Sequence, residues 1–156
     1  MNNKYVKLHS LLRMLGALLA IIVFISMFAT KMVVHEEYSN IFYDFNNGAF
    51  FGGDLCKGNV FGFFGYLFVL LGGLAGLAFV FVDELIGKDL TKKLSFVVGG
   101  VILLGAIFIF LFAPFFNAIN ERNDMVDAAG PIVFGILAVL AACSNVASPI
   151  LEDKGY

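Results

Sequence analysis

Apolar runs about 20 residues long alternate with short polar segments along the whole chain. The four runs cover residues 13–34, 60–82, 94–116 and 128–147. An α-helix rises about 1.5 Å per residue, so each run is long enough to cross the ~30 Å hydrocarbon core of a bilayer. The pattern predicts an all-α membrane protein. Its single domain, residues 1–156, is expected to be an up-down bundle of four transmembrane helices.

The connection between the first two runs, residues 34–59, is unusually aromatic. In its middle, Asn46-Asn47-Gly48 contains an Asn-Gly pair, which favours the tight turn of a β-hairpin because both turn positions need a positive φ. Residues 39–45 alternate imperfectly between apolar and polar side chains. We therefore expect a small extracytoplasmic β-hairpin over the mouth of the bundle, with an irregular aromatic loop at the headgroup level as the alternative. The aromatic candidates for recognition of a partner are Tyr38, Phe42, Tyr43, Phe45, Phe50 and Phe51.

Charged residues and prolines predict the other helix ends. Residues 83–93 form a short polar connection, which makes the second and third helices antiparallel neighbours. Pro114 should end or bend the third helix, because proline lacks an N–H and clashes with the preceding turn. Pro131 suits the first turn of the fourth helix, with Asp124 or Asp127 as its N-cap. A kink is the alternative if that helix begins earlier.

Glycines are the most specific feature inside the predicted helices. Gly72 and Gly76 form a small-xxx-small pair, and Gly65 extends the same helical face by one heptad. Lipid tails are as apolar as leucine, so helices associate in a bilayer through close backbone approach at small residues. The glycines predict tight packing within one chain or, alternatively, self-association. The helix-packing candidates are Gly65, Gly72, Gly76, Gly100, Gly130 and Gly135.

Composition and charge agree with a multi-pass protein. Hydrophobic residues make up 60% of the chain and the mean hydropathy is +0.92. The net charge of −2 and the scattered basic residues give no basic stripe for a nucleic acid. Lys and Arg concentrate in the two terminal regions and in residues 83–93, whereas the opposite side carries only Lys31, Lys57 and Arg122. The positive-inside rule then predicts cytoplasmic termini in the plasma membrane.

Motifs for catalysis, cofactors or metals are not found. The predicted spans have no ionisable residue near their centres, which argues against a proton-coupled pump. The sequence has no Cys-x-x-Cys, Gly-x-Ser-x-Gly or His-Glu-x-x-His motif. Cys56 and Cys143 are predicted at different depths, too far apart for a disulfide within one chain, and Cys56 could still pair between chains. His35-Glu36-Glu37 is read as a solvated acidic segment, with a divalent-cation site as the alternative.

Four spans with both ends inside and a larger first outer loop resemble the plan of claudin-like proteins. That family carries a Gly-Leu-Trp motif and two cysteines in the first loop, whereas this chain has no Trp and only Cys56 there. A junction role is therefore not implied. The chain is also similar to small four-span membrane proteins of low-GC Gram-positive bacteria. That similarity lies in its Lys-rich start, in Lys93-Leu-Ser-Phe and in Gly130-Pro-Ile-Val-Phe-Gly135, and it implies no activity.

These features favour a non-catalytic membrane protein, without a cofactor, that acts as an interaction, scaffold, accessory or immunity-type protein. Residues 34–59 would be its recognition surface. Its surroundings would be the lipid bilayer and either further copies of itself or another membrane protein. The alternative is a small oligomeric channel or passive solute pore, which would need a polar lumen. An intramembrane enzyme has less support, because it would need convergent polar groups.

Overall fold

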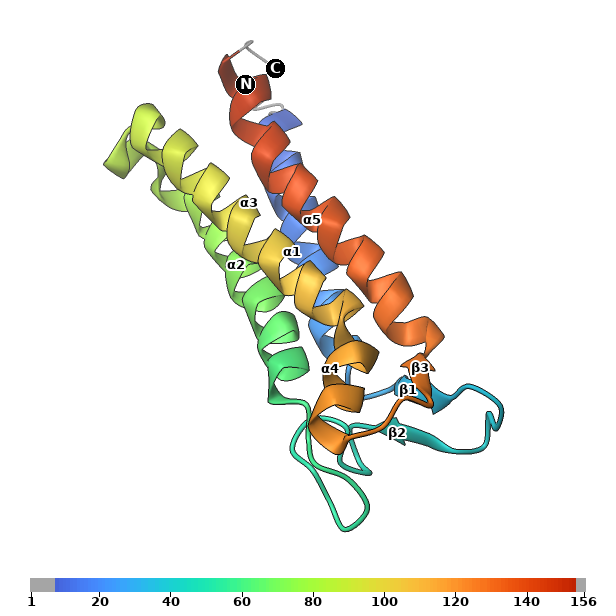
Figure 1. Ribbon diagram of the computed structural model, residues 1–156. Helices are drawn as coiled ribbons and strands as arrows, with labels where there is room; N and C mark the ends of the chain where they lie inside the picture. The colour runs from blue at the N-terminus through green and yellow to red at the C-terminus, as the bar shows by residue number, and fades with distance from the viewer. Residues whose placement is uncertain (1–7, 154–156) are drawn as a thin grey trace.

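The computed structural model describes residues 8–153, apart from the side chains of residues 83 and 84. Within this part, the long helices are α1 (Leu8–Ser26), α2 (Val60–Ile86), α3 (Lys88–Phe110) and α5 (Ala129–Asp153). A short helix, α4 (Phe112–Asn120), and three short strands gather at one end of the bundle (Figure 1). We call this the sheet end, and the opposite end, where α1 begins and α5 stops, the terminus end. Lys4, Lys7 and Lys154, which contribute to the predicted orientation, lie outside the described residues.

The long helices form the expected up-down bundle. α1 packs against α2 and α5, and α3 packs against the same two helices, so the four form a ring in which the diagonal pair α2 and α5 contacts far less. All four are long and apolar enough to cross a membrane. The prediction of a mostly helical chain with four such helices is therefore confirmed.

The inward face of α5 carries mostly small side chains, and large apolar side chains cover much of the outside of the bundle. The inward face of α5 carries Gly135, Ala138, Ala141, Ala142 and Ser144. On α1 an apolar stripe faces outward, and its exposed members at helical spacing are Leu11, Leu15, Leu18, Ile22 and Ile25. A water-soluble helix has the opposite arrangement, with its large apolar residues turned towards the core.

The first helix ends earlier than expected. α1 stops at Ser26, not at residue 34, and the apolar residues Met32 and Val33 lie in β1 (Lys31–His35), where they are buried. The Thr30 hydroxyl and the Ala29 N–H both donate to the Ser26 carbonyl at the helix end. The boundary was mispredicted because an apolar run signals burial and does not distinguish a helix end from a short buried strand.

A three-stranded antiparallel sheet closes the sheet end, in the order β2-β1-β3. β2 (Phe42–Asp44) pairs with β1 as a hairpin, with Val34 opposite Phe42. β3 (Met125–Asp127) covers the other edge of β1, with Val34 opposite Val126. The predicted hairpin thus exists, but its connection is residues 36–41. The Asn46-Asn47-Gly48 turn follows the second strand, so the prediction of a hairpin turn there was wrong.

The other helix ends depend on single residues. The Asn59 carboxamide oxygen accepts from the Gly62 N–H, 3.1 Å away, and caps the start of α2. The predicted polar connection, residues 83–93, is helical on both sides of Gly87, whose φ is +82°. α3 stops at Phe110, the residue whose carbonyl the Pro114 ring would meet, and α4 begins two residues later.

Candidate recognition surface

The six aromatic candidates separate into core and surface residues. Phe50 and Tyr43 are buried, and Phe42 and Phe45 are half-buried. Tyr38 and Phe51 are exposed, by 55% and 61%. An aromatic composition predicts a compact loop but not which rings face inward. Of the six candidates, only Tyr38 and Phe51 are exposed enough to contact a partner; the non-aromatic Leu55 of the same segment is 84% exposed.

The Phe50 ring is buried at the sheet end of the bundle. It lies 5.1 Å from the Phe112 ring and 5.8 Å from the Tyr66 ring, centroid to centroid, in edge-to-face geometry. Such aromatic pairs stabilise a fold by about 0.5–1.5 kcal/mol each beyond their buried area. These contacts hold residues 45–59 against α2 and α4. The exposed residues of this segment are therefore supported by a well-packed core.

Asn47 covers the outer edge of β2. Its side-chain nitrogen donates to the Phe42 carbonyl at 2.9 Å, and its side-chain oxygen accepts from the Asp44 N–H. The carboxamide thus occupies the place that the backbone of a further strand would take. Exposed strand edges are templates for pairing with another chain. At β2 this template is already occupied by the protein's own side chain.

The β3 edge is covered in a similar way by α4. The Asn117 side-chain nitrogen donates to the Met125 carbonyl at 2.8 Å. The Asp127 carboxylate was expected to cap α5, but it instead accepts from the Ala113 N–H at 2.8 Å, in the first turn of α4. Burial raises the pKa of Asp127 to about 6, against the opposing effect of that hydrogen bond. This role of Asp127 was missed because a side chain that caps a helix 14 residues earlier in the chain leaves no local sequence signal.

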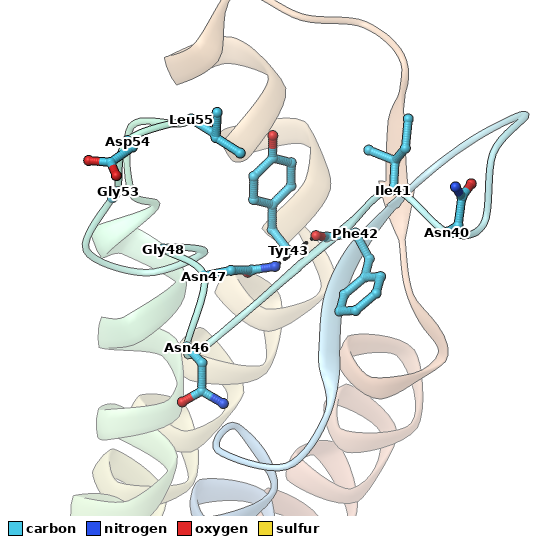
Figure 2. Close-up of a pocket in the computed structure, with 11 residues that line it drawn as sticks. Asn40, Ile41, Phe42, Tyr43, Asn46, Asn47, Gly48, Gly53, Asp54 and Leu55 are labelled. Carbon is cyan, nitrogen blue, oxygen red and sulfur yellow. Dashed lines mark hydrogen bonds between the residues drawn. The ribbon is translucent and has the colours of Figure 1, made fainter.

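A groove of about 470 Å³ runs beside β2, between the strand and residues 46–55 (Figure 2). In Figure 2 the Ile41 side chain, the Tyr43 ring and the Leu55 side chain lie on one side of the β2 chain. Asp54 stands at the rim beside Leu55, with its carboxylate turned outward (Figure 2). We call this the β2 groove; its residues used below are Ile41, Tyr43, Asn47, Asp54 and Leu55.

A charged network braces the β1–β2 connection. Arg122 donates to both Asp124 carboxylate oxygens at 2.8 Å, and its Nη1 lies 3.5 Å from the Tyr43 hydroxyl. The hydrogen bonds from Arg122 hold the pKa of Asp124 at about 2, and the same hydrogen bonds raise the pKa of Arg122. The His35 Nε2 atom lies 3.2 Å from Asp124. The network ties β1, β2 and the segment before β3 together.

His35 and Asp124 resemble half of a catalytic triad, but their geometry is structural. The His35 Nδ1 atom accepts from the backbone N–H groups of Glu37 and Tyr38, at 3.1 and 3.3 Å. Nε2 must then carry the proton, and it lies 3.2 Å from the Asp124 carboxylate. A general base needs a free lone pair within reach of a substrate proton, and neither ring nitrogen offers one here.

Metal and thiol chemistry receive no support from the described part of the chain. Residues 8–153, as far as their side chains are described, contain no group of three His, Cys, Asp or Glu that could hold a metal ion. Cys56 and Cys143 are both free. Burial raises the pKa of the Cys56 thiol, which makes it less nucleophilic at neutral pH. Cys143 is exposed on the outside of α5.

Two glycines let α2 and α3 touch backbone to backbone. A Cβ added at Gly65 would lie 2.9 Å from the Gly105 carbonyl oxygen, and one added at Gly105 would lie 2.6 Å from that of Gly65. Real Cβ atoms do not come this close to a backbone oxygen. Gly105 was not among the predicted packing residues, because its partner is known only once the two helices are in register.

The other glycine candidates have different surroundings. Gly72 lies against the Ile102 side chain and Gly135 against the Phe110 ring, both on α3. Gly76 accommodates the carboxamide of Asn145 on α5, and a Cβ on Gly130 would lie 2.9 Å from the Lys31 carbonyl oxygen. Gly100 has no atom within 4 Å of its potential Cβ position, so it takes no part in packing within the chain.

A buried charge at the terminus end escaped the sequence reasoning. Arg13 is only 1% exposed, and its guanidinium lies 3.7 Å from the Glu152 carboxylate and 3.4 Å from the Phe79 carbonyl oxygen. Arg13 therefore links α1 to α2 and to the last turn of α5. Its position in an apolar run, with Leu11 and Met14 exposed beside it, was the available signal. A charged residue among lipid-facing ones must either turn inward or reach the interface.

Comparisons with protein-family models, with curated proteins and with solved structures return no significant match to this chain.

Proposed function

We propose that this chain is a non-catalytic, multi-pass protein of the plasma membrane that recognises another protein through its sheet end. The observation that carries the proposal is the β2 groove with exposed Tyr38, Phe51 and Leu55 around a firmly packed base. A monomer gains no stability from leaving large apolar side chains in water. Exposed aromatic and aliphatic groups on a rigid support are typical of protein-binding surfaces.

Membrane placement is supported by the distribution of residue size. Large apolar side chains are exposed on the outside of all four long helices, and the inward face of α5 carries mostly small ones, which suits hydrocarbon as the surrounding solvent. Exposed phenylalanines near the sheet end, Phe28, Phe61 and Phe64, would lie at the outer part of the bilayer. The claudin-like plan stays a prediction about architecture and contributes nothing to this function.

The proposed orientation puts the sheet end outside the cell and the termini in the cytoplasm. Of the ten basic residues in the chain, only Lys31, Lys57 and Arg122 belong to the sheet end. The positive-inside rule then favours a cytoplasmic terminus end. The recognition surface would face the extracytoplasmic space.

Site-specific photo-crosslinking in native membranes tests this function. A photoreactive phenylalanine analogue at position 51 or 38 should crosslink to a second protein. The control is position 81 on α2, because Phe81 is equally aromatic and 74% exposed but lies near the terminus end; it should crosslink to lipid. The proposal fails if positions 38 and 51 yield only lipid adducts or links within the same chain.

A further inference from the structure

The sheet end has an excess of negative charge. Residues 27–59 and 111–128 contain seven Asp and Glu residues against three Lys and Arg. Two of those three cations already have contacts within the chain. Arg122 is bound by Asp124, and the Lys31 ammonium lies 3.8 Å from the centre of the Phe42 ring. Four acids, Glu36, Glu37, Asp54 and Glu121, are exposed to an approaching molecule, against two exposed cations, Lys31 and Lys57.

The β2 groove combines this charge with an apolar surface. Tyr43 lies between Ile41 and Leu55, and the only charged residue lining the groove is Asp54 at its rim (Figure 2). Leu55 is 84% exposed, so it offers apolar area that the described part of the chain leaves uncovered. An occupant that fits must bring an apolar side chain for Ile41 and Leu55 and a positive charge for Asp54.

The binding mode is restricted by Asn47. Since its carboxamide occupies the Phe42 carbonyl and the Asp44 N–H, an extended peptide cannot add to the β2 edge as a further strand at these atoms. The occupant must bind through its side chains. A second copy docking by the same acidic face would meet like charges, and anionic lipid headgroups would be repelled in the same way.

We propose that the partner contributes a cationic amphipathic segment, which packs an apolar side chain against Ile41 and Leu55 and places a Lys or Arg at Asp54. This inference rests on the proposed function and names the chemistry of the partner. Charge complementarity would raise the association rate and give a salt-dependent affinity.

The test uses the full chain in nanodiscs of phosphatidylcholine, with empty nanodiscs as background. The probe is a short fluorescent peptide, Ser-Gly-Lys-Leu-Lys-Gly-Ser, compared with its Glu-Leu-Glu counterpart. Fluorescence anisotropy should detect binding of the lysine peptide only, weakening with added salt. Equal binding of the two peptides, or binding of the glutamate peptide alone, would overturn the inference.

Matched variants locate the site. Asp54→Asn and Glu121→Gln remove the same charge from exposed positions, one at the groove and one away from it. Asp54→Asn should weaken the lysine peptide roughly threefold more than Glu121→Gln, the size expected for one exposed ion pair. Leu55→Ser should weaken it as well, without a change in melting temperature because Leu55 is exposed. Equal effects of the two charge variants would mean diffuse attraction and no groove.

The crosslinking experiment separates this inference from the proposed function. If position 51 crosslinks to a protein but the lysine peptide does not bind selectively, the proposed function is supported and the inference of a cationic partner is refuted. If no protein is crosslinked but the lysine peptide binds selectively, only the proposed function is refuted.

Discussion

Gly48 determines the path of the chain immediately after β2. Its φ is +95°, and a Cβ there would lie 2.7 Å from the Gly52 carbonyl carbon. A β-branched residue in such a conformation is strained. Gly48→Val should therefore disorder residues 45–59 and abolish crosslinking from position 51, while the helices remain inserted. Hydrogen exchange on residues 45–59 measures the disorder directly.

Gly53 provides the matched control for that change. A Cβ at Gly53 has only ordinary contacts, the nearest 3.7 Å away, and its φ is not positive. Gly53→Ala should leave exchange rates in the segment unchanged. Similar loss of protection in both variants would refute the specific role of Gly48.

Gly105 and Gly100 test close packing on a single helix. Gly105→Leu inserts bulk between the α2 and α3 backbones, where overpacking costs about 1–3 kcal/mol. Gly100→Leu meets open space and removes a flexible glycine from a helix interior, which favours the helix by up to about 1 kcal/mol. Thermal unfolding in detergent should show a lower midpoint for Gly105→Leu only.

A similar drop in midpoint for Gly100→Leu would have a different meaning. It would place Gly100 in an interface between copies, because the chain itself leaves that position open. Size-exclusion chromatography with light scattering would then show loss of an oligomer in the Gly100→Leu variant.

Among the secondary-structure elements, β3 and α4 are joined by a titrating side chain. Asp127 has a folded-state pKa of about 6, above its ordinary 3.8, because of burial. Between these two values the folded chain holds a proton that the unfolded chain has released. Its contribution therefore makes the fold more stable as the pH falls from 7 to about 4.

Asp127→Asn should remove that dependence. Asparagine keeps an oxygen for the Ala113 N–H and carries no charge, so the variant should melt higher than the parent chain at pH 7 and similarly near pH 4. Asp124→Asn is the opposite control, because the depressed pKa of Asp124 stabilises the fold above pH ~4. If the melting temperatures of Asp127→Asn and the parent chain depended on pH in the same way, Asp127 would not be the group responsible.

The long helices were predictable because their apolar pattern extends over many residues. Short strands that form by pairing with distant segments of the chain were not predictable. The apolar runs located α2, α3 and α5 because one property, lipid-facing hydrophobicity, extends over many turns. β3 is only three residues long and becomes a strand by pairing with β1. The groove depends on the turns that place Tyr43 beneath Leu55. Local composition holds no signal for either arrangement, although it identified the segment that carries the groove.

For the whole molecule, the proposed orientation is open to a labelling experiment. In a background with Cys56→Ser and Cys143→Ser, new cysteines at exposed Asn46 and Asn123 should react with an impermeant maleimide added to intact cells. A cysteine at exposed Lys88 should react only after permeabilisation. Labelling of position 88 in intact cells would invert the topology and place the β2 groove in the cytoplasm.

Gly87 divides the molecule into two complementary halves. Residues before it hold α1, α2, β1 and β2, and residues after it hold α3, α4, β3 and α5. Each half is a helical hairpin with its own share of the sheet, and the halves meet along α1–α5, α2–α3 and β1–β3. A single residue links the two halves along the chain, whereas extensive packing holds them together in the fold. Two polypeptides divided at Gly87 and made in the same cell would therefore retain nearly every contact needed to reassemble.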